Sequence, residues 1–193
     1  MLKLLTINFP SCSGTNWLIE IVCLIQTKGN SQWIQSVPNW NRSPWLETKV
    51  GYPILTNQEG PRLISSHLPF HLFPKSFFSS KAKMIYVIRN PRDVLVSGYF
   101  FFHKTNIIKN PESFINYFEW FLKGNVIFGS WFEHTRAWLS MRERDNFLLL
   151  SYEDLKQVTN ILISTTNPLT NLPHGASHIL QCCHVSVRLM STH

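Results

Sequence analysis

Four short apolar runs in this sequence are each followed by side chains that could bind an anion or accept a proton. A turn of small residues before a helix offers backbone N–H groups to a phosphate. Arginine offers a planar fork of donors to the same group, and an imidazole can take a proton from a hydroxyl near neutral pH. The side chains concerned are Ser13, Gly14, Thr15, His67, Arg89 and Tyr152. Their types favour chemistry on a small molecule that carries phosphate.

The apolar runs that precede these residues have the length and composition of β-strands, and segments with helical spacing separate them. Such an alternation predicts an α/β fold with a central, mostly parallel sheet. Ligands of such sheets bind beyond the carboxyl ends of the strands, so the fold is expected to bring the six residues to one edge. The expected strands are 4–9, 62–66, 83–88 and 146–151, and the expected helices are 17–25, 91–102, 116–141 and one that begins at 153.

The segment after Arg89 carries the signals of a helix start. Asn90 is a good N-cap, Pro91 suits the first helical position, and Asp93 lies where the helix dipole favours an acid. Ser97 follows two helical turns after Arg89, so both side chains could face the same anion. A surface ion pair between Arg89 and a nearby acid is the competing interpretation.

Aromatic side chains are frequent, with 14 Phe and 7 Trp in 193 residues. Some of them could line an apolar pocket, although core packing is the ordinary role of such residues. The candidates for a pocket are Trp40, Trp45, Phe100, Phe101 and Phe102.

Composition and charge narrow the class of protein further. The hydrophobic share of 44% is ordinary for a globular chain, and the net charge of +7 favours an anionic partner. No Lys/Arg run typical of a nucleic-acid patch occurs, so a small molecule is favoured over nucleic acid. The four cysteines and the histidines show no zinc spacing. Without a signal-peptide pattern or a membrane-length apolar stretch, we expect a cytoplasmic protein with no membrane contact.

Several ordered segments together resemble the cytosolic sulfotransferases, in their hydroxysteroid and bile-salt branch. The resemblance rests on the run from Ser13 to Leu18, on Ser66-His67-Leu68-Pro69, on Arg89–Asp93 with Val96–Tyr99, and on Phe147–Lys156. Trp33–Pro38 and Leu72–Phe78 point to the hydroxysteroid branch in particular. The likeness extends from about Thr6 to Lys156. It implies a P-loop-like three-layer fold in which helices flank the central sheet.

The resemblance also implies a function and a role for each matching residue. Members transfer a sulfuryl group from 3′-phosphoadenosine 5′-phosphosulfate (PAPS) to an alcohol, here a hydroxysteroid or bile salt, without a metal. His67 would be the catalytic base. The implied donor-binding residues are Ser13, Gly14, Thr15, Asn16, Trp17, Arg89, Ser97 and Tyr152, and the implied acceptor-binding residues are Trp40, Trp45 and Phe101.

Three departures from the family pattern affect what we expect. The family's Pro-Lys-Ser-Gly-Thr loop reads Pro-Ser-Cys-Ser-Gly-Thr here, and losing the lysine at Cys12 is expected to lower the rate about a hundredfold. The chain starts almost at its first strand. The likeness stops near Lys156, and 157–193 holds neither an Arg-Lys-Gly run nor the dimer motif. We therefore expect a partial domain over 1–156, a poorly ordered tail over 157–193, and a monomer.

The sequence is also compatible with two other functions. The missing lysine and the missing Arg-Lys-Gly run favour a catalytically inactive, nucleotide-binding fragment of the same family. A nucleotide kinase has a related fold, but the sequence has no Walker lysine and no clear magnesium-binding acid after a strand.

Overall fold

The structure is a computed structural model that describes residues 4–8, 14–105 and 110–157. Within these residues four strands form one sheet, in which every neighbouring pair is parallel and the order is β2-β1-β3-β4. The strands are β1 (Leu4–Asn8), β2 (Arg62–Ser66), β3 (Lys83–Ile88) and β4 (Phe147–Ser151). The four predicted strands are confirmed to within one residue at each end. The predicted phosphate-loop residue Ser13, its neighbour Cys12 and the predicted tail beyond residue 157 lie outside the described residues.

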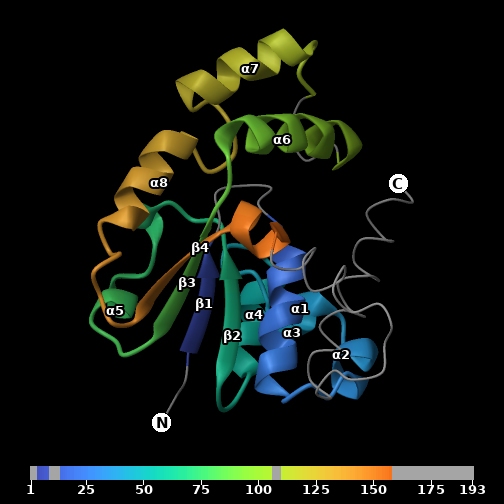
Figure 1. The fold of residues 1–193 in the computed structure, drawn as a ribbon, viewed down its shortest axis with the longest axis vertical. Coiled ribbons are helices and arrows are strands. Elements are labelled where there is room, and N and C mark those ends of the chain that lie inside the picture. The colour runs from blue at the N-terminus through green and yellow to red at the C-terminus, as the bar shows by residue number, and fades with distance from the viewer. Residues whose placement is uncertain (1–3, 9–13, 106–109, 158–193) are drawn as a thin grey trace.

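Helices connect the strands and lie on both faces of the sheet, as the predicted three-layer fold requires (Figure 1). On one face α1 and α2 pack against the sheet, and on the other face α5 and α8 do so. The helices are α1 (Thr15–Gln26), α2 (Gln32–Ser36), α3 (Asn39–Arg42), α4 (Gly51–Asn57), the 3-10 helix η1 (Phe70–Leu72), α5 (Lys75–Phe78), α6 (Pro91–Thr105), α7 (Phe114–Lys123) and α8 (Trp131–Leu139). A further helical segment covers 152–157.

Strand β3 is buried on both of its faces. Its side chains alternate, so that Ile85 and Val87 join the core cluster under α1, while Met84 and Tyr86 join the cluster under α5 and α8. All four side chains are buried. A continuous apolar strand is therefore explained by its central place in a parallel sheet, as the sequence predicted.

Helix α6 begins where the capping signals predicted. Pro91 is its first residue, and the side-chain oxygen of Asn90 accepts a hydrogen bond from the N–H of Arg92 at 3.0 Å. Val94 and Leu95 are buried against α7. This start fixes the direction in which α6 leaves the end of β3, above the carboxyl ends of the strands (Figure 1).

The helix predicted over 116–141 is two helices, α7 and α8, with a turn between them. Three residues of the turn are left-handed: Gly124, which ends α7, and the consecutive pair Phe128 and Gly129, with φ values of 73°, 70° and 80°. Ser130 then caps α8, since its hydroxyl accepts a hydrogen bond from Glu133 N–H. Helical periodicity continues across this segment, but the glycines and the serine cap end one helix and start another.

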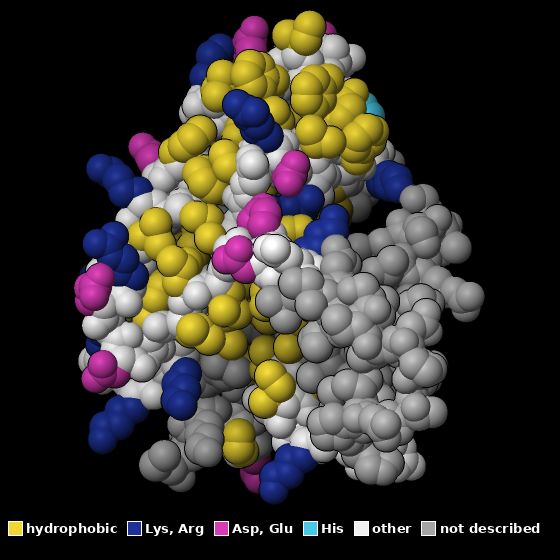
Figure 2. All heavy atoms as spheres, in the orientation of Figure 1, with side chains coloured by type: hydrophobic (Ala, Val, Ile, Leu, Met, Phe, Trp, Pro, Cys, Tyr) yellow, Lys and Arg dark blue, Asp and Glu magenta, His cyan; other side chains and the backbone are white. Residues whose placement is uncertain are grey.

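Apolar side chains also lie on the outer side of the layer formed by α6 and α7 (Figure 2). Here α7 is aromatic on its buried face and apolar on its exposed face as well. The aromatic density of the segment therefore did not predict which of its side chains are in the core. The exposed apolar residues on these two helices are Val96, Phe100, Phe101, Phe114, Ile115, Phe118 and Leu122.

Candidate functional site

The carboxyl ends of the strands lie at one edge of the sheet, as their register shows. Asn8 at the end of β1 is opposite both Ser66 and Tyr86, and Ile88 is opposite Ser151. The residues that follow the strands therefore meet around one cavity of about 660 Å³. Its lining includes nine of the predicted site residues: Gly14, Thr15, Asn16, Trp45, His67, Arg89, Ser97, Phe101 and Tyr152.

Gly14 is the last residue before α1 and occupies a place that only glycine fits. Its φ is 85°, in the left-handed region, and a Cβ atom there would lie 2.7 Å from the Tyr152 ring. The backbone of this turn thus approaches the tyrosine directly. The first-turn N–H groups of α1 have no partner within the helix, so they form an anion-binding end at the cavity wall.

Arg89, Tyr152 and Trp17 form a cluster of one cation and two aromatic rings next to Gly14. The Arg89 guanidinium carbon lies 4.5 Å from the centre of the Tyr152 ring, in cation–π geometry. The Trp17 ring packs edge-on against the Tyr152 ring at a centroid distance of 5.9 Å. Tyr152 therefore holds Arg89 at the end of β3, where its charge faces the cavity.

Glu153 ties together the ends of β3 and β4. Its carboxylate accepts hydrogen bonds from the backbone N–H of Asn90 at 2.8 Å and from the Ser151 hydroxyl at 3.1 Å. Slight burial raises the pKa of Glu153, but these hydrogen bonds and the charge of Arg89 outweigh it, so the pKa is lowered overall. Glu153 is therefore ionised at neutral pH and keeps the loop of Arg89 beside that of Tyr152.

His67 lines the cavity and is only 5% exposed. Its Nδ1 is 3.1 Å from the carbonyl oxygen of Ser66. A carbonyl only accepts, so Nδ1 carries the hydrogen and Nε2 carries the lone pair that can take a proton. The ring is held edge-on between Trp45 and Phe128, at centroid distances of 4.6 and 5.3 Å.

Trp45 and Glu47 reach the site because the segment before them pairs with β2. The N–H of Ser65 bonds to the carbonyl of Pro44, and the N–H of Leu46 bonds to the carbonyl of Ser65. Glu47 then accepts the backbone N–H of His67 at 2.7 Å through its Oε1. Burial raises the pKa of Glu47 above its usual value, although hydrogen bonds from His67 N–H and Ser66 oppose the shift. The carboxyl group of Glu47 therefore lies in the cavity wall next to His67.

Two predicted site residues do not line the cavity. Trp17 packs edge-on against Tyr152, and Trp40 on α3 is 62% exposed. The role predicted for each stays a prediction. The cavity also has five lining residues that the sequence analysis did not select. These are Glu47, Thr48, Phe102, Ile127 and Phe128, and of them only Phe102 had been considered as a pocket candidate. The left-handed turn at Gly124–Gly129 was the one local signal that could have drawn attention to Phe128.

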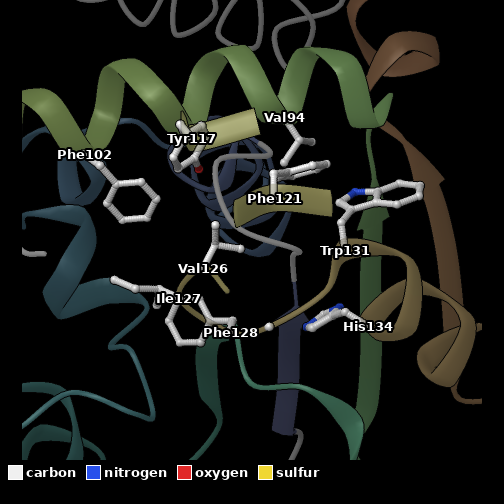
Figure 3. A pocket seen from close by; sticks show the side chains of 11 residues that line it. Val94, Phe102, Tyr117, Phe121, Val126, Ile127, Phe128, Trp131 and His134 are labelled. Atoms are coloured by element: carbon white, nitrogen blue, oxygen red, sulfur yellow. The ribbon is translucent and has the colours of Figure 1, made fainter. Parts of the chain in front are cut away.

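A small apolar cavity of about 20 Å³ lies behind the main one, between α6, α7 and α8 (Figure 3). Phe102, Ile127 and Phe128 line both cavities. Figure 3 shows Phe128 and His134 below the rings of Tyr117 and Phe121. The wall between the two cavities is therefore formed by Ile127 and Phe128 of the turn before α8 together with Phe102 of α6.

The described lining residues include one guanidinium, that of Arg89, and one carboxyl group, that of Glu47, whose pKa is raised by burial. Within residues 4–8, 14–105 and 110–157, no group of three His, Cys, Asp or Glu residues is arranged to hold a metal ion. The helices in this part of the chain are all too short or too polar to cross a membrane. The arrangement can bind an anion at the Gly14–Arg89 side and accept a proton at His67.

Known proteins with similar sequences belong to one family. Residues 6–164 match the sulfotransferase domain. Sulfotransferase 2A1 of Mus musculus is 72% identical over 156 residues, which are 81% of this chain and 54% of that protein. The 3-beta-hydroxysteroid sulfotransferase of Cavia porcellus is 62% identical over 159 residues, which are 82% of this chain and 55% of that protein. The chain thus spans about half the length of the curated relatives it matches.

Solved structures agree with the sequence comparison. A mouse sulfotransferase crystallised in complex with PAP superposes with a TM-score of 0.69 at 25% identity, and the match covers 93% of this chain and 63% of that one. Fold, ordered motifs and sequence identity therefore lead to the same result. This chain belongs to the sulfotransferase family.

Proposed function

We propose that this protein transfers a sulfuryl group from PAPS to the hydroxyl group of a hydroxysteroid or bile salt. The observation that carries the proposal is the single cavity that joins an anion-binding helix end and Arg89 to the imidazole of His67. A donor with two phosphate-bearing ends and an alcohol acceptor would meet there. The name of the Cavia porcellus relative, 3-beta-hydroxysteroid sulfotransferase, supports the steroid class of the acceptor.

The donor would occupy the side of the cavity formed by Gly14 and the start of α1. Its 5′-phosphosulfate would accept hydrogen bonds from the N–H groups of Thr15, Asn16 and Trp17. The sequence predicts the same role for Ser13, which lies outside the described residues. Arg89 and Ser97 would bind the 3′-phosphate, because a guanidinium and a hydroxyl are strong donors to phosphate oxygens. Tyr152 would support the adenine end. The glycine at position 14 leaves room for the Tyr152 ring to pack directly against this turn.

His67 would act as the general base. The hydrogen on Nδ1 points to the Ser66 carbonyl, so Nε2 can accept the acceptor's proton. The alcohol oxygen attacks sulfur in line, a new S–O bond forms, and the bond between sulfur and the 5′-phosphate oxygen breaks. The hydroxyl proton ends on His67, and the electron pair leaves with adenosine 3′,5′-bisphosphate. Donors at the helix end would stabilise that leaving phosphate.

The acceptor would lie against the aromatic side of the cavity. Trp45, Phe101 and Phe128 offer apolar surface beside His67, which suits a rigid ring system with one hydroxyl. Trp40 on α3 is exposed and would join this side only where a bound acceptor covers it. We further propose that the protein acts in the cytoplasm on small molecules, as a monomer and without a metal; the free thiol of the buried Cys23 is consistent with a reducing compartment.

The experiment is sulfuryl transfer from radiolabelled PAPS to dehydroepiandrosterone by the full chain, with His67→Ala beside it. We expect turnover in the wild type and a loss of about a hundredfold or more in the variant. His71→Ala is the matched control, because His71 is exposed and does not line the cavity. Equal rates in wild type and His67→Ala would contradict the assignment of the base.

Binding of adenosine 3′,5′-bisphosphate separates the proposal from its strongest competitor. Cys12 stands where the family loop has lysine, which favours a protein that binds the nucleotide but does not react. Tight binding with no turnover in a folded sample would establish that second function. Turnover, even at a low rate, would show that the remaining donors are sufficient.

A further inference from the structure

Helix α8 holds the backbone on which His67 is carried. His134 Nε2 is 3.2 Å from the carbonyl oxygen of His67, and Trp138 Nε1 donates to the carbonyl of Leu68 at 3.2 Å. The two side chains are four residues apart and therefore project from the same face of the helix. Both are buried, with Trp138 fully so. Two consecutive carbonyls after β2 are thus bound by one helix that is distant in sequence.

The hydrogen bonds around His134 define its tautomer. The carbonyl of His67 can only accept, so the hydrogen of His134 is on Nε2. Its Nδ1 then accepts from the hydroxyl of Tyr86, which is 3.0 Å away on β3. The Thr135 hydroxyl lies 3.4 Å from the same Tyr86 oxygen. A buried chain therefore runs from the central strand through His134 to the backbone of His67.

His134 provides this donor without a charge. Burial lowers the pKa of His134 to about 4, and the hydrogen bonds to the carbonyls of His67 and Leu68 only partly oppose that shift. A neutral donor fixes the carbonyl without placing a positive charge near the imidazole of His67. Such a charge would lower the basicity that a general base needs.

We propose that His134 is a positioning residue for His67, which it holds through the carbonyl of His67 and with the help of Trp138. The inference rests on the proposed function for its kinetic consequence, though not for the hydrogen bonds themselves. On the opposite side Glu47 binds the N–H of His67, so both backbone polar groups of this residue are held. Its ring is then directed by the Ser66 carbonyl and by Trp45 and Phe128.

The test compares three variants of the full chain. His134→Leu removes the donor, His134→Gln retains an amide N–H that can reach the carbonyl of His67, and Thr135→Val removes a hydroxyl from the same buried cluster without touching the His67 segment. We expect His134→Leu to lower kcat tenfold or more, with KM and the affinity for adenosine 3′,5′-bisphosphate changed less than about twofold. Glutamine should restore most of the rate, and Thr135→Val should keep it.

Nitrogen-15 NMR of the imidazole rings gives a readout that needs no turnover. In the wild type we expect hydrogen on Nε2 of His134 and on Nδ1 of His67. In His134→Leu the His67 signals should move towards an average of both tautomers, and in Thr135→Val they should stay. The opposite tautomer at His134, or unchanged His67 signals and an unchanged kcat in His134→Leu, would overturn the inference. If the wild type transfers no sulfuryl group, the proposed function fails while the tautomers still decide the positioning role.

Discussion

The two sides of the cavity are built in different ways. The donor side consists of Gly14, Arg89 and Tyr152, which directly follow or precede elements of the sheet layer and contact one another. The base side consists of His67 and four residues that hold its backbone or ring: Glu47, Phe128, His134 and Trp45. The donor side is positioned by the sheet register, whereas the base side is positioned by side chains from distant segments. Disturbing the first should change binding, and disturbing the second should change the rate.

The largest effect on the donor side is expected from Arg89→Gln. A charged, bidentate donor to phosphate is replaced by a neutral one, which corresponds to a loss of about 1.5–3 kcal/mol. We expect the affinity for adenosine 3′,5′-bisphosphate to fall roughly ten- to hundredfold in isothermal titration calorimetry. Arg92→Gln is the control, because Arg92 is exposed on α6 and does not line the cavity. Equal losses in both variants would mean that only the net charge of the chain matters.

Two glycines with similar φ values separate the effect of the Tyr152 contact at the donor side from the effect of a positive φ. Gly14 and Gly60 have φ values of 85° and 81°, but a Cβ atom would meet Tyr152 at 2.7 Å only at Gly14 and nothing within 4 Å at Gly60. Alanine should cost about 1 kcal/mol of stability at Gly60 and more at Gly14, where the Tyr152 ring must also move. We expect only Gly14→Ala to weaken nucleotide binding as well, by about tenfold. Unchanged binding in Gly14→Ala would place the nucleotide away from this turn.

Glu47 gives a pH-dependent test of the base side. Its pKa is raised in the folded state, so its contribution to stability is present below the ordinary pKa of glutamate and is lost as the pH rises through the folded value. Glu47→Gln cannot titrate but keeps an oxygen for the N–H of His67. The free energy of unfolding of wild type minus that of the variant should therefore fall between pH 4 and pH 7. Urea titrations measure it, and a rise over that interval would contradict the raised pKa.

The smallest effect is expected from Tyr152. Its ring carries the cation–π contact with Arg89, which is worth about 0.5–1 kcal/mol at a partly exposed site. Tyr152→Leu should weaken nucleotide binding about two- to fivefold, while Tyr152→Phe retains the ring and should bind as the wild type does. If the phenylalanine variant loses as much as the leucine variant, the hydroxyl group is the part that matters.

The sequence predicted the sheet and the meeting of Gly14, Arg89 and Tyr152 at one cavity, because both depend on local patterns. Apolar strands, the turn at Gly14 and the cap at Asn90 each have a signature within a few residues, and the parallel sheet brings their ends together. The supports of His67 have no such signature. Glu47 is placed by pairing of its segment with β2, and His134 looks like any polar residue in an amphipathic helix until the fold places it under His67.

The segment over 116–141 shows a second limit of prediction from sequence. Its aromatic periodicity is continuous, yet α7 and α8 are separated by a turn that carries Phe128 into the cavity wall. Periodicity reports which residues share a helical face but does not show where the chain leaves the helix. Ile115 and Phe118 on α7 are apolar yet exposed, so residue type alone likewise does not predict which side chains are buried.

The central claim is that one cavity serves both the donor and the acceptor, and a crystal structure of the full chain with adenosine 3′,5′-bisphosphate and dehydroepiandrosterone tests it most directly. We predict the 5′-phosphate at the start of α1, the 3′-phosphate at Arg89 and Ser97, and the steroid hydroxyl within hydrogen-bond distance of His67 Nε2. A nucleotide bound elsewhere, or a steroid hydroxyl turned away from His67, would contradict the account.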